Sequence, residues 1–352
     1  MRKKKILGML LAATMAFGCL TGVKPVKADS SYQFKKQYKL KAGDEYSKSP
    51  EETFTFEDAQ LSAVSKTSYN TTAQKQDISE LPDANTANIP EGVKKVTIGD
   101  VSFEKGAAVK GGVEKNVTVN TPTAETYKSS GYYFYKFKEN KGNTAGVTYN
   151  DNTYYIRVAV AYDSSSSTYE VKNIAIMNEQ MEKTAGIEND YSAGEIAIEK
   201  VVTGNMANND ETFDVTVTFK PAEGTKLKSE IISSINDNSL GEVTISGNED
   251  EMKATFKVKA GTKVSFKNLP EGVTYTVEEK QANGYDVPSY KINGTSGKNE
   301  GTIEGGKSDS VIITNNRQGE IDNGVFMNNL PYLLILAFAG ACGVVFVVRK
   351  RH

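Results

Sequence analysis

The stretch IAIEKVVTG, residues 196–204, alternates in the way that a half-buried β-strand does. Ile196, Ile198 and Val202 fall on one face, and Lys200 falls on that face too, because successive side chains of a strand point to opposite sides. A buried ammonium group is costly unless it has a partner. The stretch therefore predicts a strand whose buried face carries a lysine, which either reaches water at a sheet edge or has a specific use in the core.

Similar alternating runs fill most of the chain. They are rich in β-branched and aromatic residues, and Gly, Asn, Asp and Pro separate them; the clearest are YQFKKQYKL (32–40), YYFYKFK (132–138), TYYIRVAVAY (153–162), ETFDVTVTF (211–219) and MKATFKVKA (252–260). KLKSEIISSI (226–235) could form a short helix, and residues 57–92 are interpreted as a long loop or insertion with room for a helical turn. The pattern predicts an all-β fold of two tandem β-sandwich domains.

Lysine, glutamate and asparagine recur in one order, twice, and each is in phase with the buried residues of its strand. Each glutamate has a tyrosine four residues earlier, in YKFKE (135–139) and YTVEE (275–279). Each asparagine follows an isoleucine by two residues, in IEN (187–189) and ITN (313–315). The two predicted sets are Lys36, Glu139 and Asn189, and Lys200, Glu279 and Asn315.

Such a set has a chemical use. Burial in an apolar core lowers the pKa of a lysine, and the neutral amine is a nucleophile. A buried carboxylic acid can polarise an asparagine amide and move protons. Attack of the amine on the amide carbon releases ammonia and leaves a Lys–Asn isopeptide bond, a single-turnover reaction that needs no separate enzyme. Residues held in contact supply a large effective concentration.

Both ends of the chain carry targeting segments. Basic residues, an apolar run and Val26-Lys27-Ala28 predict a signal peptide over residues 1–28; a lipoprotein signal ending at Cys19 is the alternative. Residues 330–348 are apolar and long enough to span a bilayer, and the basic tail, residues 349–352, should remain in the cytoplasm. The part between is expected outside the cell, tethered at its C-terminal end.

The expected exterior has a composition that argues against several functions. Nine of the 42 basic residues lie in the two terminal segments, which leaves 33 bases against 44 acids and a net charge of −11, so nucleic acid is an unsuitable partner. The exterior holds no cysteine or histidine, which excludes disulfides, Ser-His-Asp and Cys-His catalysis and the common zinc sites. We expect no enzyme of ordinary turnover, no cofactor and no metal; YNDN (149–152) is interpreted as a turn rather than a calcium site.

The chain resembles Gram-positive pilin subunits with self-generated isopeptide bonds. Residues 29–192 resemble the streptococcal pilin isopeptide-linkage domain, and residues 193–318 resemble the collagen-adhesin B-type (CnaB-like) domain. The stretches of the second domain that carry its resemblance are IAIEKVVTG, LPEGVTYTVEE and VIITNN. The resemblance implies immunoglobulin-like sandwiches in which the glutamates catalyse the two cross-links. AGIEND lacks the usual phenylalanine before its asparagine, so Asn178 is an alternative to Asn189. Glu278 and Asn316 have the wrong strand phase.

The resemblance also implies attachment by a sortase. A linker, residues 319–329, contains EIDNG in the place of the sorting motif, which comprises Glu320, Ile321, Asp322, Asn323 and Gly324. Asp322 and Asn323 replace the usual Pro and Thr, and cleavage is expected after Asn323. Lys183 is the candidate lysine that accepts the next subunit. The implied partners are a sortase and either other pilins or peptidoglycan, at the Gram-positive cell surface.

Three alternatives remain at this point. The apolar span could simply anchor the protein in the membrane. Lys183 could be one more solvated lysine of a turn. The protein could also be a monomeric surface adhesin that binds a host or cell-surface ligand, because the same fold serves both purposes.

Overall fold

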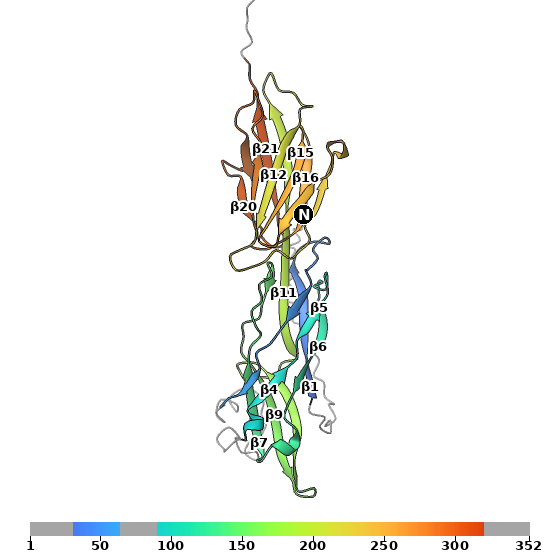
Figure 1. Ribbon diagram of the computed structural model, residues 1–352, viewed down its shortest axis with the longest axis vertical. Coiled ribbons are helices and arrows are strands. Elements are labelled where there is room, and N and C mark those ends of the chain that lie inside the picture. The colour runs from blue at the N-terminus through green and yellow to red at the C-terminus, as the bar shows by residue number, and fades with distance from the viewer. Residues whose placement is uncertain (1–30, 64–89, 320–352) are drawn as a thin grey trace, which may run out of the picture.

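The computed structural model describes residues 31–63 and 90–319, which form an elongated all-β structure (Figure 1). The all-β prediction is confirmed: the helical elements in those ranges are short 3-10 turns, η2 (Glu91–Val93), η3 (Ala124–Thr126) and η4 (Asn238–Leu240). No helix within them is long and apolar enough to cross a membrane. The predicted signal peptide, sorting motif, apolar span and basic tail lie outside the described residues.

The N-terminal half is the lower body in Figure 1. Its main sheet has the order β10-β9-β7-β3-β4-β6-β1-β11, where β11 comprises Gly186–Thr203 and also pairs with β8, and β2 and β5 form a separate pair. The strands are β1 (Ser31–Ala42), β2 (Glu52–Phe54), β3 (Ala59–Leu61), β4 (Lys95–Ile98), β5 (Val101–Phe103), β6 (Val113–Asn120), β7 (Gly131–Phe137), β8 (Val147–Thr148), β9 (Tyr154–Asp163) and β10 (Thr168–Met177).

The C-terminal half is the upper body in Figure 1 and contains two sheets. One has the order β14-β15-β12-β17-β20, and the other is built on β11, β21, β18 and β19 with β16 and β13 beside β11. The strands are β12 (Phe213–Lys220), β13 (Ile232–Ile235), β14 (Thr244–Asn248), β15 (Glu251–Val258), β16 (Lys263–Pro270), β17 (Thr274–Glu279), β18 (Ser289–Ile292), β19 (Thr295–Ser296), β20 (Glu300–Thr302) and β21 (Ser308–Asn316).

One strand, β11 (Gly186–Thr203), runs through both halves (Figure 1). Its first part pairs in parallel with β1, and its second part pairs in parallel with β21. Residues 191–194 are buried on both faces, and the buried phase changes there from odd-numbered to even-numbered residues. The strand therefore presents one face to the N-terminal half and the opposite face to the C-terminal half.

The buried apolar residues form two main clusters, one in each half. The first is rich in aromatic rings, such as Phe34, Tyr38 and Phe54. The second is built mainly from the alternating residues of the C-terminal strands, such as Ile198 and Ile313, and also receives Ala145 from the N-terminal half. Alternation therefore accounts for the two main cores apart from Ala145. A smaller third cluster lies on the other face of β7 and β9, which are buried on both sides; it comprises Tyr132, Phe134, Ala159, Ala175, Met177 and Met181.

Two local expectations need comment. The short helix proposed for residues 226–235 is wrong: Ile232–Ile235 form strand β13, which pairs with β16, because the sheet edge supplies hydrogen-bond partners that outweigh helical propensity. In the proposed loop, residues 57–92, the described part contains the short strand β3 and the first residues of η2. The rest of that segment lies outside the described residues.

Candidate functional site

The first site is positioned by the parallel pairing of β1 with β11. Lys36 alternates with Phe34 and Tyr38 on the buried face of β1 and is itself fully buried. The register pairs Lys36 with Ile187 and Tyr38 with Asn189. Residues two apart on a strand share a face, so the lysine and the asparagine face the same core from adjacent strands.

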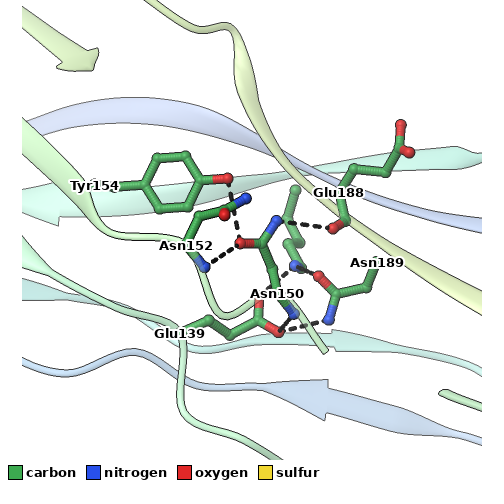
Figure 2. Close-up of polar contacts among 7 residues, drawn as sticks. Glu139, Asn150, Asn152, Tyr154, Glu188 and Asn189 are labelled. Atoms are coloured by element: carbon green, nitrogen blue, oxygen red, sulfur yellow. Dashed lines mark hydrogen bonds and ion pairs between the residues drawn. The ribbon is translucent and has the colours of Figure 1, made fainter. Parts of the chain in front are cut away.

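Lys36, Glu139 and Asn189 meet in this core. The Lys36 Nζ donates to Glu139 Oε2 and to Asn189 Oδ1, and the Asn189 Nδ2 donates to Glu139 Oε1 at 2.5 Å. Figure 2 shows the Glu139 carboxyl group facing Asn189, with Asn150 beside both. One carboxyl oxygen thus contacts the amine nitrogen and the other contacts the amide nitrogen.

Lys200, Glu279 and Asn315 form a second site with the same design. The register pairs Lys200 with Ile313 and Val202 with Asn315, so the asparagine again lies two residues beyond the partner of the lysine. The Lys200 Nζ lies 2.6 Å from Glu279 Oε2, and the Asn315 Nδ2 donates to Glu279 Oε1 at 2.5 Å. The Asn315 Oδ1 is buried and has no hydrogen-bond partner among the described residues.

Burial changes the acidity of both lysines. Desolvation lowers the pKa of Lys36 to about 8, although the nearby Glu139 carboxylate opposes the shift. Desolvation also lowers the pKa of Lys200, again against the opposing effect of its carboxylate partner, Glu279. Both amines are therefore closer to the neutral, nucleophilic form than an exposed lysine is.

Each site has an aromatic wall that the sequence analysis did not identify. The Lys36 Nζ lies 4.4 Å from the ring centroid of Phe54, and the Lys200 Nζ lies 4.3 Å from that of Phe213. Both rings are buried, so they help to keep water away from the amines. The sequence contains a signal for this wall, because each phenylalanine ends a Glu-Thr-Phe triplet, at 52–54 and at 211–213.

The alternative residues lie elsewhere. Asn178 holds its own turn, where its Oδ1 accepts from the backbone N–H groups of Gln180 and Glu182. Asn316 donates to Asp286 at 2.7 Å, and the side chain of Glu278 is exposed. The structure therefore brings together the three residues of each predicted set, at two separate sites, and none of these alternative residues lies at either site.

The predicted acceptor, Lys183, is exposed and belongs to the short segment between β10 and β11. Its backbone forms a bridge with Met177. Desolvation, aided by the positive charge of Arg157, lowers its pKa. The sorting residues 320–324 lie outside the described ranges, so their relation to Lys183 is not described. Within residues 31–63 and 90–319, no group of three or more acidic, histidine or cysteine side chains is arranged to hold a metal ion.

Known proteins resemble this chain in sequence and in fold. The model described as "Domain of unknown function (DUF7601)" matches residues 194–317. A protein named "Pilin" from Streptococcus pyogenes serotype M1 is 23% identical over 253 residues, which is 66% of this chain and 73% of that protein. This chain is pilin-like. The pilin-like chain is also 29% identical to the pilus tip adhesin Cpa of Streptococcus pyogenes over 123 residues, 35% of this chain but 16% of the adhesin.

Crystal structures support the pilin-like fold. The major pilin from Streptococcus pyogenes matches with a TM-score of 0.50 and 19% identity over 82% of this chain and 99% of that chain. A variant of the same pilin matches with a TM-score of 0.52 and 18% identity, with the same coverage. At this level of identity the match establishes the fold.

Proposed function

We propose that this chain is the backbone subunit of a Gram-positive surface pilus and that each of its two domains is closed by a Lys–Asn isopeptide bond. The observation that carries the proposal is the repeated buried Lys–Glu–Asn arrangement, at the same parallel register, in a chain that resembles pilins in sequence and fold. The protein is accordingly a structural component of the cell surface rather than an enzyme with turnover.

The contacts suggest how each bond forms. In the first site, Lys36 passes a proton to Glu139 Oε2, and the resulting amine attacks the Asn189 amide carbon. A second proton from the lysine nitrogen reaches Nδ2 through the carboxyl group, whose Oε1 contacts that nitrogen. The bond between the amide carbon and Nδ2 breaks, ammonia leaves, and one new C–N bond remains. Lys200, Glu279 and Asn315 react in the same way.

The surroundings favour this reaction over hydrolysis. The reacting groups of both sites are buried, and Phe54 and Phe213 cover the amines. Fixed neighbours on adjacent strands have already lost the freedom that a bimolecular reaction would have to remove. A chain without exported cysteine thereby acquires a cross-link that reducing agents cannot open.

The same proposal covers the organisation of the chain. The domains comprise residues 29–192 and 193–318 and are immunoglobulin-like, CnaB-like sandwiches; the two separate apolar cores support this division. A sortase cleaves the chain after Asn323 and joins it to an amine of another subunit or of peptidoglycan. Lys183 is the proposed acceptor within the shaft, and its exposure and lowered pKa favour that role.

The intact mass of the purified exterior tests the cross-links. We expect a mass below that of the sequence by two ammonias, and peptide mapping should join Lys36 to Asn189 and Lys200 to Asn315. A mass equal to that of the unmodified sequence would refute the proposed chemistry.

Cell-wall extracts test polymerisation and distinguish the adhesin alternative, for which the match to the tip adhesin Cpa is the supporting observation. A backbone subunit should give a ladder of detergent-resistant multimers that Lys183→Ala abolishes. The nearby exposed lysine variant Lys172→Ala is the matched control and should keep the ladder. A single anchored band from the unsubstituted protein would favour the adhesin.

A further inference from the structure

The connection from β7 to β9 contains a loop, residues 139–150, whose two ends meet at the first site. The backbone N–H of Asn150 donates to Glu139 Oε1 at 3.3 Å, and the Asn150 Nδ2 donates to the carbonyl of Glu188 at 3.3 Å (Figure 2). Asn150 Oδ1 in turn accepts from the Asn152 N–H at 3.0 Å and the Tyr154 hydroxyl at 3.3 Å. Asn150 therefore ties the catalytic carboxyl group to the residue that precedes Asn189.

The tip of the same loop packs against the second domain. The backbone N–H of Ala145 donates to the Lys226 carbonyl at 2.9 Å, and the Lys226 N–H donates to the Asn143 carbonyl at 2.6 Å. Ala145 is buried and packs in the core cluster of the second domain. A loop with close ends and its own anchoring contacts behaves as one compact unit.

The segment just after the tip fits closely against the joint between the domains. Gly146 has a φ of +78°, its carbonyl accepts from the Ser192 N–H at 2.9 Å, and β8 then pairs with β11. A Cβ at Gly146 would lie 2.7 Å from the Ser192 carbonyl oxygen and 2.8 Å from the Pro270 Cβ. Only glycine allows this approach without displacing the loop.

The second site has no such dependence. Glu279 is the last residue of β17, and its backbone N–H donates to the Tyr290 hydroxyl at 2.8 Å. Tyr290 lies on β18 of the same domain. The acid of the second site is thus held within its own domain. The backbone of Glu139 also pairs with Phe56 of its own domain, but its carboxyl group meets Asn150, which ends a loop that the other domain anchors.

We propose that the second domain positions Glu139 for the first cross-link through the loop 139–150, with Asn150 as a positioning residue. This inference rests on the proposed function. The Lys36–Asn189 bond forms at its full rate only after the second domain has folded and received the tip of the loop. A carboxyl group displaced by about 1 Å can slow a reaction about a hundredfold, so an unanchored loop is expected to delay the bond severely.

The test compares Gly146→Ala with Gly106→Ala in the complete exterior. Both glycines have a φ of +78°, but a Cβ at Gly106 meets nothing within 4 Å, so the control carries the same backbone strain without the contact. Samples taken at intervals after a short pulse of synthesis are digested, and each cross-linked peptide is quantified. We expect Gly146→Ala to slow the Lys36–Asn189 bond on the order of tenfold or more, with the Lys200–Asn315 bond unchanged.

A second pair of variants tests the other end of the loop and does not disturb its tip. Asn150→Ala should slow the first bond alone, whereas Asp151→Ala, at the exposed neighbouring position, should not. Asn150→Asp retains an acceptor for the Asn152 N–H and the Tyr154 hydroxyl but loses the donor to the Glu188 carbonyl and places a second carboxylate near Glu139, so the first bond should stay slow in this variant too.

The outcomes separate this inference from the proposed function. If the unsubstituted exterior forms both bonds and both Gly146→Ala and Asn150→Ala form the first at its normal rate, the inference is wrong and the proposed function stands. Equal slowing of both bonds by Asn150→Ala would also overturn it, because it would indicate general unfolding. An unsubstituted exterior without either bond would refute the proposed function itself.

Discussion

Asn189 and Lys200 lie on the same strand, β11, but they contact different cores. Asn189 meets Lys36 and Glu139 in the N-terminal core, and Lys200 meets Glu279 in the C-terminal core. The change of buried phase at residues 191–194 makes this possible, because it turns opposite faces of the strand inward on either side of the joint. One strand therefore supplies the amide of the first site and the amine of the second.

Glu279→Ala should remove one cross-link without affecting the other. The variant should be heavier than expected from the substitution alone by one ammonia, and its second domain should unfold at lower temperature. In the chain-entropy description of disulfides, a cross-link across about 100 residues contributes about 4 to 5 kcal/mol, and a similar order is expected for residues 200 to 315. Intact mass and calorimetry measure both effects.

Glu278→Ala is the matched control for that substitution. Glu278 is adjacent in sequence but exposed, on the other face of β17. The control should keep both cross-links and the stability of the unsubstituted exterior. Loss of the bond in Glu278→Ala, or its retention in Glu279→Ala, would show that Glu279 is not the catalytic acid.

The two aromatic walls should act on separate sites. Phe54→Ala opens the core beside Lys36 and should slow the first bond, whereas Phe213→Ala should slow the second, because water then solvates the ammonium form of each amine. Each substitution should also cost about 3 to 5 kcal/mol of domain stability as a cavity in the core. Peptide mapping over time distinguishes the sites, and each variant serves as the control for the other. Equal delay of both bonds would contradict the local role of the rings.

Asn189→Ala should abolish the first cross-link, and Asn178→Ala should leave it intact. Asn178 instead accepts two backbone hydrogen bonds in its turn, so its loss should lower local stability by about 1 kcal/mol. The mass deficit of two ammonias should remain. Intact mass answers the question directly. If Asn178→Ala lost the mass deficit of one ammonia, Asn178 rather than Asn189 would be the amide partner of Lys36.

The stability of Asn189→Ala should rise with pH above about 8. Lys36 remains a free amine in this variant, and its folded pKa of about 8 lies below the ordinary value of 10.5, so the unfolded state binds more protons between those values. The free energy of unfolding should therefore increase by at most about 1.4 kcal/mol per pH unit. Denaturant titrations from about pH 7 to about pH 9.5 measure the slope. The upper limit keeps the measurement below the pH at which tyrosines ionise.

The unsubstituted exterior is the control for this pH dependence. Its Lys36 nitrogen is an amide in the proposed product and does not titrate, so the lysine contribution should be absent. A rise of the same slope in both proteins would show that other groups cause it.

Strand phase made much of this site predictable from the sequence. Side chains alternate strictly along a strand, so Lys36, Lys200, Asn189 and Asn315 could be assigned to buried faces before any pairing was known. The two glutamates could be separated from their neighbours in the same way. Which strands lie side by side depends on long-range packing, and for that step the signals were the repeated order of the residues and the resemblance to pilin domains.

Other features were not predictable because they depend on contacts between the halves. DYSAGE, residues 190–195, has the small residues of a boundary, yet it forms the middle of β11. The small residues are needed there because the backbones crowd together: a Cβ at Gly194 would lie 2.4 Å from the carbonyl oxygen of Glu304. The insertion of Ala145 into the other core has no signal in the local pattern.

The continuity of β11 has a consequence for how the molecule would break. With both isopeptide bonds in place, the chain contains two closed covalent rings, one from residue 36 to 189 and one from residue 200 to 315. Only the ten residues between the rings, 190–199, join them through the main chain alone. A protease that cut there would leave the halves without any covalent connection despite both bonds, and this short piece is also where the fold places strands or loops against both edges of β11.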